Sequence, residues 1–134
     1  MRHRTRDKKL GRSSAHRDMA ISATVCNLVK RGRVKTTISK ARQARSMAEK
    51  MVTIARKGNI HARRLLVSRL RDKGCSAKLV DEIAPRFAER NGGYTRILKL
   101  GSRMSDGSEM VLLEWTESAP LSEPSSTAPL ESGK

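Results

Sequence analysis

The sequence predicts a small α+β domain in which helices pack on one face of a three-stranded sheet. Apolar residues recur at helical spacing in four segments and alternate with polar residues in three others, in the order helix, strand, three helices, two strands. The 134 residues are the size of one domain. Aromatic residues make up only 2%, so the core must be built from Leu, Ile, Val, Met and Ala. Periodicity does not specify the order of the strands.

The first helix is predicted over residues 14–31. Ser13 or Ser14 is a suitable N-cap, and we expect Asp18 in the first turn, where a negative charge is favoured. Two apolar stripes wrap most of its circumference, which predicts a largely buried helix. They comprise Met19, Ile21, Ala23, Val25, Cys26, Leu28 and Val29.

A short strand and a second helix should follow. Residues 33–38 alternate in polarity as a strand does, and Ser39 is placed to cap a helix over 40–57. The small and apolar residues of that helix form one stripe, namely Ala41, Ala44, Ala48, Met51, Val52 and Ala55. Its charged residues are expected on the opposite face, namely Arg42, Arg45, Glu49 and Arg56.

Two more helices are predicted between residues 60 and 87. Asn59 can cap a helix over 60–71, and we expect Gly74 to separate it from a fourth helix that begins at Ser76. Pro85 should kink that helix or start a short second turn, because proline disfavours helical geometry in the residue before it.

A hairpin completes the predicted domain. Residues 94–100 and 109–116 read as two antiparallel strands around a turn at 105–108. On the last strand Val111, Leu113 and Trp115 share one face.

Composition divides the chain into three parts. Residues 1–13 hold six Lys and Arg and almost no apolar residues, which predicts a basic RNA-binding arm that is disordered when free. Residues 14–117 form the globular α+β domain. Residues 118–134 hold three prolines and five serines, which predicts a disordered tail.

The charge is extreme and unevenly distributed. The formal net charge is +16 and the pI is about 11.1. Residues 1–72 hold 21 Lys and Arg against 4 Asp and Glu, whereas residues 73–117 hold 7 of each. A body this basic needs a polyanion to neutralise it, and the asymmetry indicates that one side meets nucleic acid.

Catalysis and metal binding find little support in the sequence. The motifs HExxH and GxSxG and the P-loop are absent, and Asp81 and Glu82 are adjacent on a helix and so do not face each other. Cys26 and Cys75 lie 49 residues apart without metal-ligand spacing. The favoured interpretation is that both cysteines are buried thiols, and a disulfide between them is the alternative that the sequence leaves open. We therefore expect no enzyme, metal, cofactor or small-molecule substrate.

Localisation and partner class follow from what the sequence lacks. The start has no apolar h-region and no apolar run approaches 18 residues, so we expect a cytoplasmic protein without a membrane partner. Zinc fingers, zippers and surface aromatics of the RNA-recognition-motif type are absent. The mode of nucleic-acid binding that remains is recognition of the phosphates and the shape of a folded RNA. The alternative is a free basic protein that compacts DNA or RNA.

Four blocks stand out in collinear order between residues 1 and 116, namely Met1-Arg2-His3-Arg4 with Lys9–Arg17, Val34-Lys35-Thr36-Thr37 with Lys40-Ala41, Leu70-Arg71-Asp72-Lys73, and Gly92–Lys99. Together they resemble the bacterial large-subunit ribosomal protein seventeen family. The resemblance implies a structural protein of the large ribosomal subunit that binds its rRNA near the nascent-chain exit region, beside other ribosomal proteins. Ser22-Ala23 stand where that family often carries an Arg-Asn pair.

We expect the RNA contacts on the arm, the first strand and the exposed helix faces. The candidates are Arg2, His3, Arg4, Arg6, Lys8, Lys9, Arg12, Ser13, His16, Arg17, Lys35, Thr36, Thr37, Lys40, Arg42, Arg45, Arg63, Arg64, Arg71 and Arg96.

Overall fold

The computed structural model of the chain describes residues 9–117. The predictions for residues 1–8 of the arm and for the tail, 118–134, lie outside the described residues. The elements are α1 (Ser14–Arg31), β1 (Arg33–Thr37), α2 (Ile38–Ala55), α3 (Ile60–Leu70), α4 (Lys73–Lys78), a π-helical turn η1 (Leu79–Ile83), a 3-10 turn η2 (Ala84–Phe87), β2 (Thr95–Ser102) and β3 (Glu109–Trp115).

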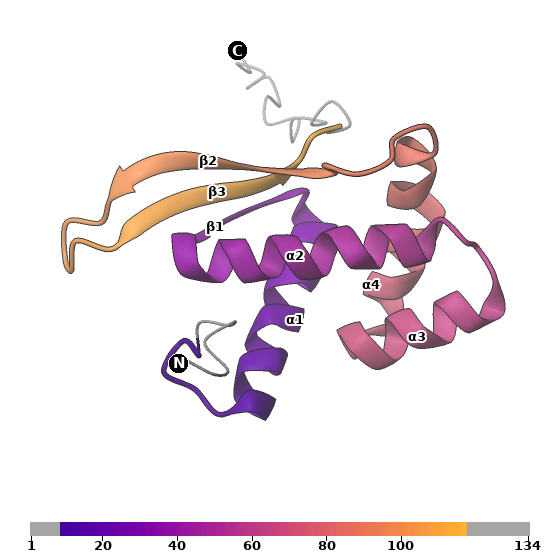
Figure 1. Ribbon diagram of the computed structural model, residues 1–134, viewed down its shortest axis with the longest axis horizontal. Coiled ribbons are helices and arrows are strands. Elements are labelled where there is room, and N and C mark those ends of the chain that lie inside the picture. Colours follow the sequence, from indigo (N-terminus) through magenta and orange to yellow (C-terminus); the bar gives the residue numbers. More distant parts are fainter. Residues whose placement is uncertain (1–8, 118–134) are drawn as a thin grey trace, which may run out of the picture.

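The predicted fold class is confirmed. The three strands form one antiparallel sheet in the order β1-β3-β2, so the last strand lies in the centre. Figure 1 shows α1 and α2 on one side of this sheet, with α2 running along it. Val111, Leu113 and Trp115, which the sequence places on one face of β3, are all buried, whereas the alternate residues of that strand are only partly buried. The helices therefore cover one face.

All three aromatic residues of the chain lie in the core. The ring centroids of Phe87 and Tyr94 are 5.1 Å apart, and those of Phe87 and Trp115 are 6.0 Å apart. The indole Nε1 of Trp115 donates to the carbonyl of Leu28 at 3.2 Å. This bond joins the end of the sheet to α1.

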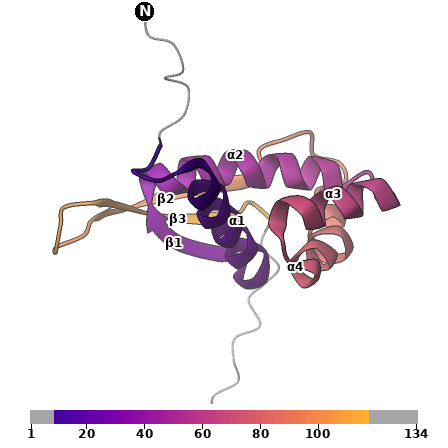
Figure 2. The ribbon, with the colours of Figure 1, turned by 90° about the horizontal axis from the view of Figure 1, so that it is seen from below.

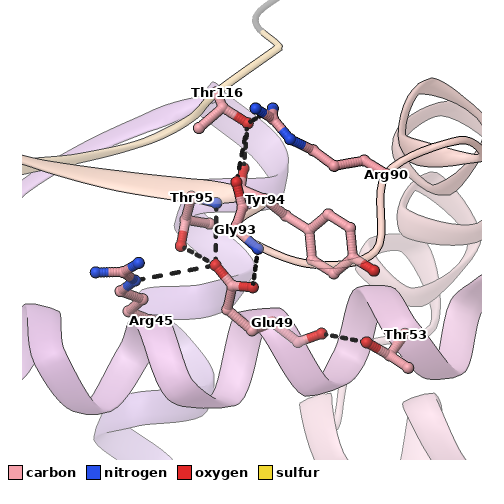
Figure 3. Close-up of polar contacts among 8 residues, drawn as sticks. All are labelled: Arg45, Glu49, Thr53, Arg90, Gly93, Tyr94, Thr95 and Thr116. Atoms are coloured by element: carbon pink, nitrogen blue, oxygen red, sulfur yellow. Dashed lines mark hydrogen bonds and ion pairs between the residues drawn. The ribbon is translucent and has the colours of Figure 1, made fainter.

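Glu49 fastens the start of β2 to α2 (Figure 3). Its carboxylate accepts hydrogen bonds from the backbone N–H of Gly93 at 3.1 Å, and from the backbone N–H and hydroxyl of Thr95 at 3.1 and 2.9 Å. The sequence places Glu49 opposite the apolar stripe of this helix but does not reveal this role, because the groups that the carboxylate binds lie 44 and 46 residues further along the chain.

Arg56 has a similar structural role. Its guanidinium donates to the carbonyls of Ala88 and Arg90, at 2.6 and 2.8 Å, and to the hydroxyl of Tyr94 at 3.0 Å. Together these bonds hold the segment that follows η2 against the end of α2.

Two predicted helix starts are wrong by a few residues. Ser39 does not cap α2, because β1 ends at Thr37 and that extended residue is the N-cap. Gly74 lies inside α4 instead of before it, because the side chain of Asp72 caps the helix by accepting from the N–H of Cys75 at 3.0 Å. Helix α3 ends at its C-cap Arg71, whose backbone φ of +58° lies in the left-handed region.

The first helix is less buried than predicted. Met19 is 55% exposed and Ala23 is also exposed, because α1 packs on its neighbours along one side only. Asp18 is not in the first turn of the helix. Further along the chain, the change of helix type at Ala84, just before Pro85, agrees with the predicted short second turn.

The β2–β3 hairpin projects beyond the helices (Figures 1 and 2). Leu98, Leu100 and Met104 are 42%, 49% and 104% exposed. Residues 95–115 hold three Lys and Arg and three Asp and Glu, so the hairpin carries no net charge. It thus differs sharply from the basic N-terminal half.

Candidate nucleic-acid interface

The predicted RNA-binding residues lie at the surface wherever they are described. Five of them, Arg2, His3, Arg4, Arg6 and Lys8, fall outside the described residues. Each of the others is exposed or partly buried. They are spread over the segment before α1, the start of α1, β1, α2, α3 and β2, so the structure does not gather all of them into one patch.

Two candidate groups coincide with helix starts that no side chain caps. Ser13 is the N-cap of α1 and Thr37 that of α2, and neither side chain makes a capping hydrogen bond. Neither helix has an acidic residue in its first turn. By contrast, Asn59 and Asp72 cap α3 and α4 with their side chains. Uncapped N–H groups and the positive end of the helix dipole suit an anion such as phosphate.

Basic residues flank both uncapped helix starts. Lys9, Arg12 and Arg17 lie before and within the start of α1, whereas Lys35 and Lys40 flank Thr37. Figures 1 and 2 place the segment before α1 near the end of α2 at which that helix begins. The two groups therefore offer one side of the molecule to a polyanion.

Three of the candidate cations are already engaged by carboxylates. Arg63 pairs with Asp81 at 2.7 Å, Arg96 pairs with Glu114, and Arg45 lies 3.9 Å from Glu49. The remaining described candidates form no ion pair with another described residue, namely Lys9, Arg12, Arg17, Lys35, Lys40, Arg42, Arg64 and Arg71. Their charges remain available to a ligand.

A cleft of about 760 Å³ opens between α1, α2 and α3. It brings Arg17 and Arg71, both predicted, together with Lys50 and Arg69, which the sequence did not single out. Helical spacing places Lys50 on one face of α2 with the cleft-lining residues 43, 46, 47 and 54. That periodicity was the available signal. The role of Arg69 depends on how α3 packs, and no local pattern reveals it.

The two cysteines are buried and free, as the favoured interpretation predicted. The thiol of Cys75 donates to the carbonyl of Cys26 at 3.7 Å, and the thiol of Cys26 donates to that of Leu70 at 3.6 Å. The hydrogen bond with the Cys26 side chain, together with burial, raises the pKa of the Cys75 thiol. Cys75 is therefore protonated.

Residues 9–117 contain no cluster of three or more His, Cys, Asp and Glu side chains that could hold a metal ion. Within the same residues, none of the helices combines the length and the apolar character needed to span a membrane.

Comparison with known proteins adds independent evidence. Residues 20–116 match the family model described as ribosomal protein L17. The chain is 48% identical over 117 residues to the large ribosomal subunit protein bL17 of Methylacidiphilum infernorum, covering 87% of this chain and 89% of that protein. It is 46% identical to the bL17 of Clostridium acetobutylicum and 45% identical to that of Clostridioides difficile, over 80% of this chain and 94% and 95% of theirs.

Proposed function

This chain belongs to the ribosomal protein L17 family, and from that premise we propose that it binds large-subunit rRNA through phosphate and shape contacts. It is a structural protein of the bacterial large ribosomal subunit, in the cytoplasm, and not an enzyme. The proposal extends to its surroundings: the protein lies near the nascent-chain exit region, beside other large-subunit proteins.

The two uncapped helix starts are the observation that carries the proposal. The N–H groups after Ser13 and Thr37 have no capping side chain, and cations without a described ion-pair partner flank both. A phosphate at either site gains hydrogen bonds, the helix dipole and neighbouring positive charge together. The two helices whose starts are capped begin with Asn59 and Asp72, and neither of these is among the candidate residues.

The aromatic residues support phosphate contacts over base stacking as the main mode. Phe87, Tyr94 and Trp115 are the chain's whole aromatic set, and all three are buried. A stacking platform of the kind that single-strand binders use is therefore missing. The hydroxyls of Thr36 and Thr37 and the cations beside them suit the backbone of a folded RNA.

The test compares two lysine pairs of equal charge. Lys35→Gln with Lys40→Gln removes two cations beside the start of α2, whereas Lys57→Gln with Lys99→Gln removes one from the turn after α2 and one from the hairpin. Binding to large-subunit rRNA is measured over a range of salt concentrations. In the first variant only, the slope of log K against log[salt] should become shallower by about one for each phosphate that the protein no longer neutralises.

Equal slopes in the two double variants would refute this placement of the interface. Co-sedimentation of the wild-type chain with large subunits through a high-salt wash tests the wider proposal. Complete release in that wash, with retained binding to unrelated DNA or RNA, would favour the free nucleic-acid-compacting protein instead.

A further inference from the structure

We propose that the cleft between α1, α2 and α3 holds one unpaired nucleotide of the bound RNA. This inference rests on the proposed function and names a site for a base within it. The cleft has a volume of about 760 Å³, and its lining combines basic with apolar side chains.

The floor can accept the flat face of a base. Ile21, Met47, Ile54 and Leu65 line the cleft, and all four are only partly buried. Three of them, Ile21, Met47 and Ile54, pack against the main core from the cleft side. Apolar area left open in this way gains from covering by an unstacked base, and the flexible thioether of Met47 can adapt its shape to the ring.

The rim has the charge of a phosphate-binding surface. Arg17, Lys50, Arg69 and Arg71 stand around the cleft with one carboxylate, that of Asp18. None of the four cations forms an ion pair with a described residue. A nucleotide offers both a phosphate to this rim and a base to the floor, and a guanidinium plane can also stack on that base.

An acidic peptide could satisfy the rim charge as well, but the position of the cleft favours RNA. Arg17 belongs both to the cleft and to the uncapped start of α1, so one RNA strand can pass from that helix start into the cleft. Ser46 and Ser68 place exposed hydroxyls in the lining, where they can bond a base edge. The hydroxyl of Ser22 is already engaged, because it donates to the carbonyl of Arg69 at 2.9 Å.

The test fills the cleft without changing its charge. Ser46→Trp and Ser68→Trp place an indole in the lining from α2 and from α3, and Ala77→Trp is the control at an exposed helix position outside it. In complexes with large-subunit rRNA, the wild-type chain should protect the base edge of a single nucleotide from chemical probes. Either cleft variant should restore that reactivity and weaken binding measurably. The control should do neither.

A photoreactive benzophenone side chain at Ser68 identifies the occupant directly. A crosslink to one rRNA nucleotide in assembled subunits supports the proposal. A crosslink to a neighbouring protein, or none at all, overturns it.

Failure here is separable from failure of the proposed function. If Ser46→Trp and Ser68→Trp fold by circular dichroism and leave the protection unchanged, the cleft holds no base. The lysine variants at 35 and 40 would still lower the salt slope in that case. If they do not lower it, the proposed phosphate contacts themselves are wrong.

Discussion

Replacing Glu49 should show how much of the domain's stability depends on one carboxylate. Glu49→Ala removes the acceptor of three hydrogen bonds, from Gly93 N, Thr95 N and Thr95 Oγ1. Glu49→Gln keeps one acceptor oxygen but removes the charge. Because Thr95 is only 2% exposed, water cannot replace the carboxylate freely in the alanine variant.

The size of the effect follows from the hydrogen bonds that the variant cannot form. Leaving a buried donor unsatisfied costs about 1–3 kcal/mol, and hydrogen bonds to charged groups contribute about 1.5–3 kcal/mol each. The side chain of Glu49 is 22% exposed, which reduces the sum. We expect Glu49→Ala to lower the free energy of unfolding by about 3 kcal/mol and Glu49→Gln by about 1 kcal/mol. At roughly 4 °C per kcal/mol, the alanine variant should melt about 12 °C lower.

Urea unfolding followed by circular dichroism measures these differences, with an unchanged m-value showing that the folded state is retained. Glu82→Ala is the matched control, since that side chain is 55% exposed and its nearest cation, Lys78, is 3.9 Å away. It should change the free energy of unfolding by less than about 0.5 kcal/mol. An equal loss in Glu49→Ala and Glu82→Ala would refute the role assigned to the carboxylate.

Four further outcomes are expected. The hydrogen bond from the ammonium of Lys30, and a further one from a backbone N–H, lower the pKa of Asp72. Its carboxylate therefore stabilises the fold above the ordinary pKa of 3.8, and this contribution is lost as the pH falls from there through the lowered pKa of the folded state. The stability gap between wild type and Asp72→Asn should therefore close in acid unfolding curves. Cys26 and Cys75 should react with a thiol reagent only in denaturant, and rapid labelling of the folded chain would contradict their burial. Deleting residues 2–12 should keep the thermal midpoint but reduce occupancy in purified large subunits, so equal occupancy would argue against an RNA-binding arm. A chain ending at Glu117 should match the full chain in both measurements, because the tail has few large apolar residues and a net charge of −1; a lower midpoint would show that the tail packs on the domain.

The elements were predictable where their signals are local. The helical stripe of α2 and the alternation of Val111, Leu113 and Trp115 depend only on neighbours in the chain, and the structure places them as expected. The central position of β3 was not predictable, because alternation marks one buried face and says nothing about which strands flank it.

The predicted helix starts were wrong where two nearby residues could each serve as the N-cap. Thr37 and Ser39 are both good N-caps, as are Asp72 and Ser76. The pairing of Thr37 with Met110 of β3 decides the first case, since it keeps Thr37 extended up to the helix. Such a choice depends on a strand more than 70 residues away, which no window of sequence contains.

The candidate site shows the same division. Charge and composition were enough to nominate Arg17 and Arg71, but their meeting with Lys50 and Arg69 around one cleft depends on how three helices pack. Conversely, Arg96 was also nominated, and the structure gives its guanidinium a partner in Glu114. Side chains of equal charge thus differ in whether they are free to bind RNA, because the tertiary structure decides which of them are paired with a carboxylate.

The central position of β3 also sets the order of events during synthesis. β1 and β2 pair only with β3, so a nascent chain that has not reached residue 109 carries two strands without a partner, although all its helices are already made. The bond from Trp115 to Leu28 spans 87 residues, so the core too is closed by the last element. Folding of the sheet is therefore delayed until the domain is almost completely translated, and products of early termination keep open strand edges that promote aggregation. Only a chain that has been read to its final strand presents a finished domain for assembly.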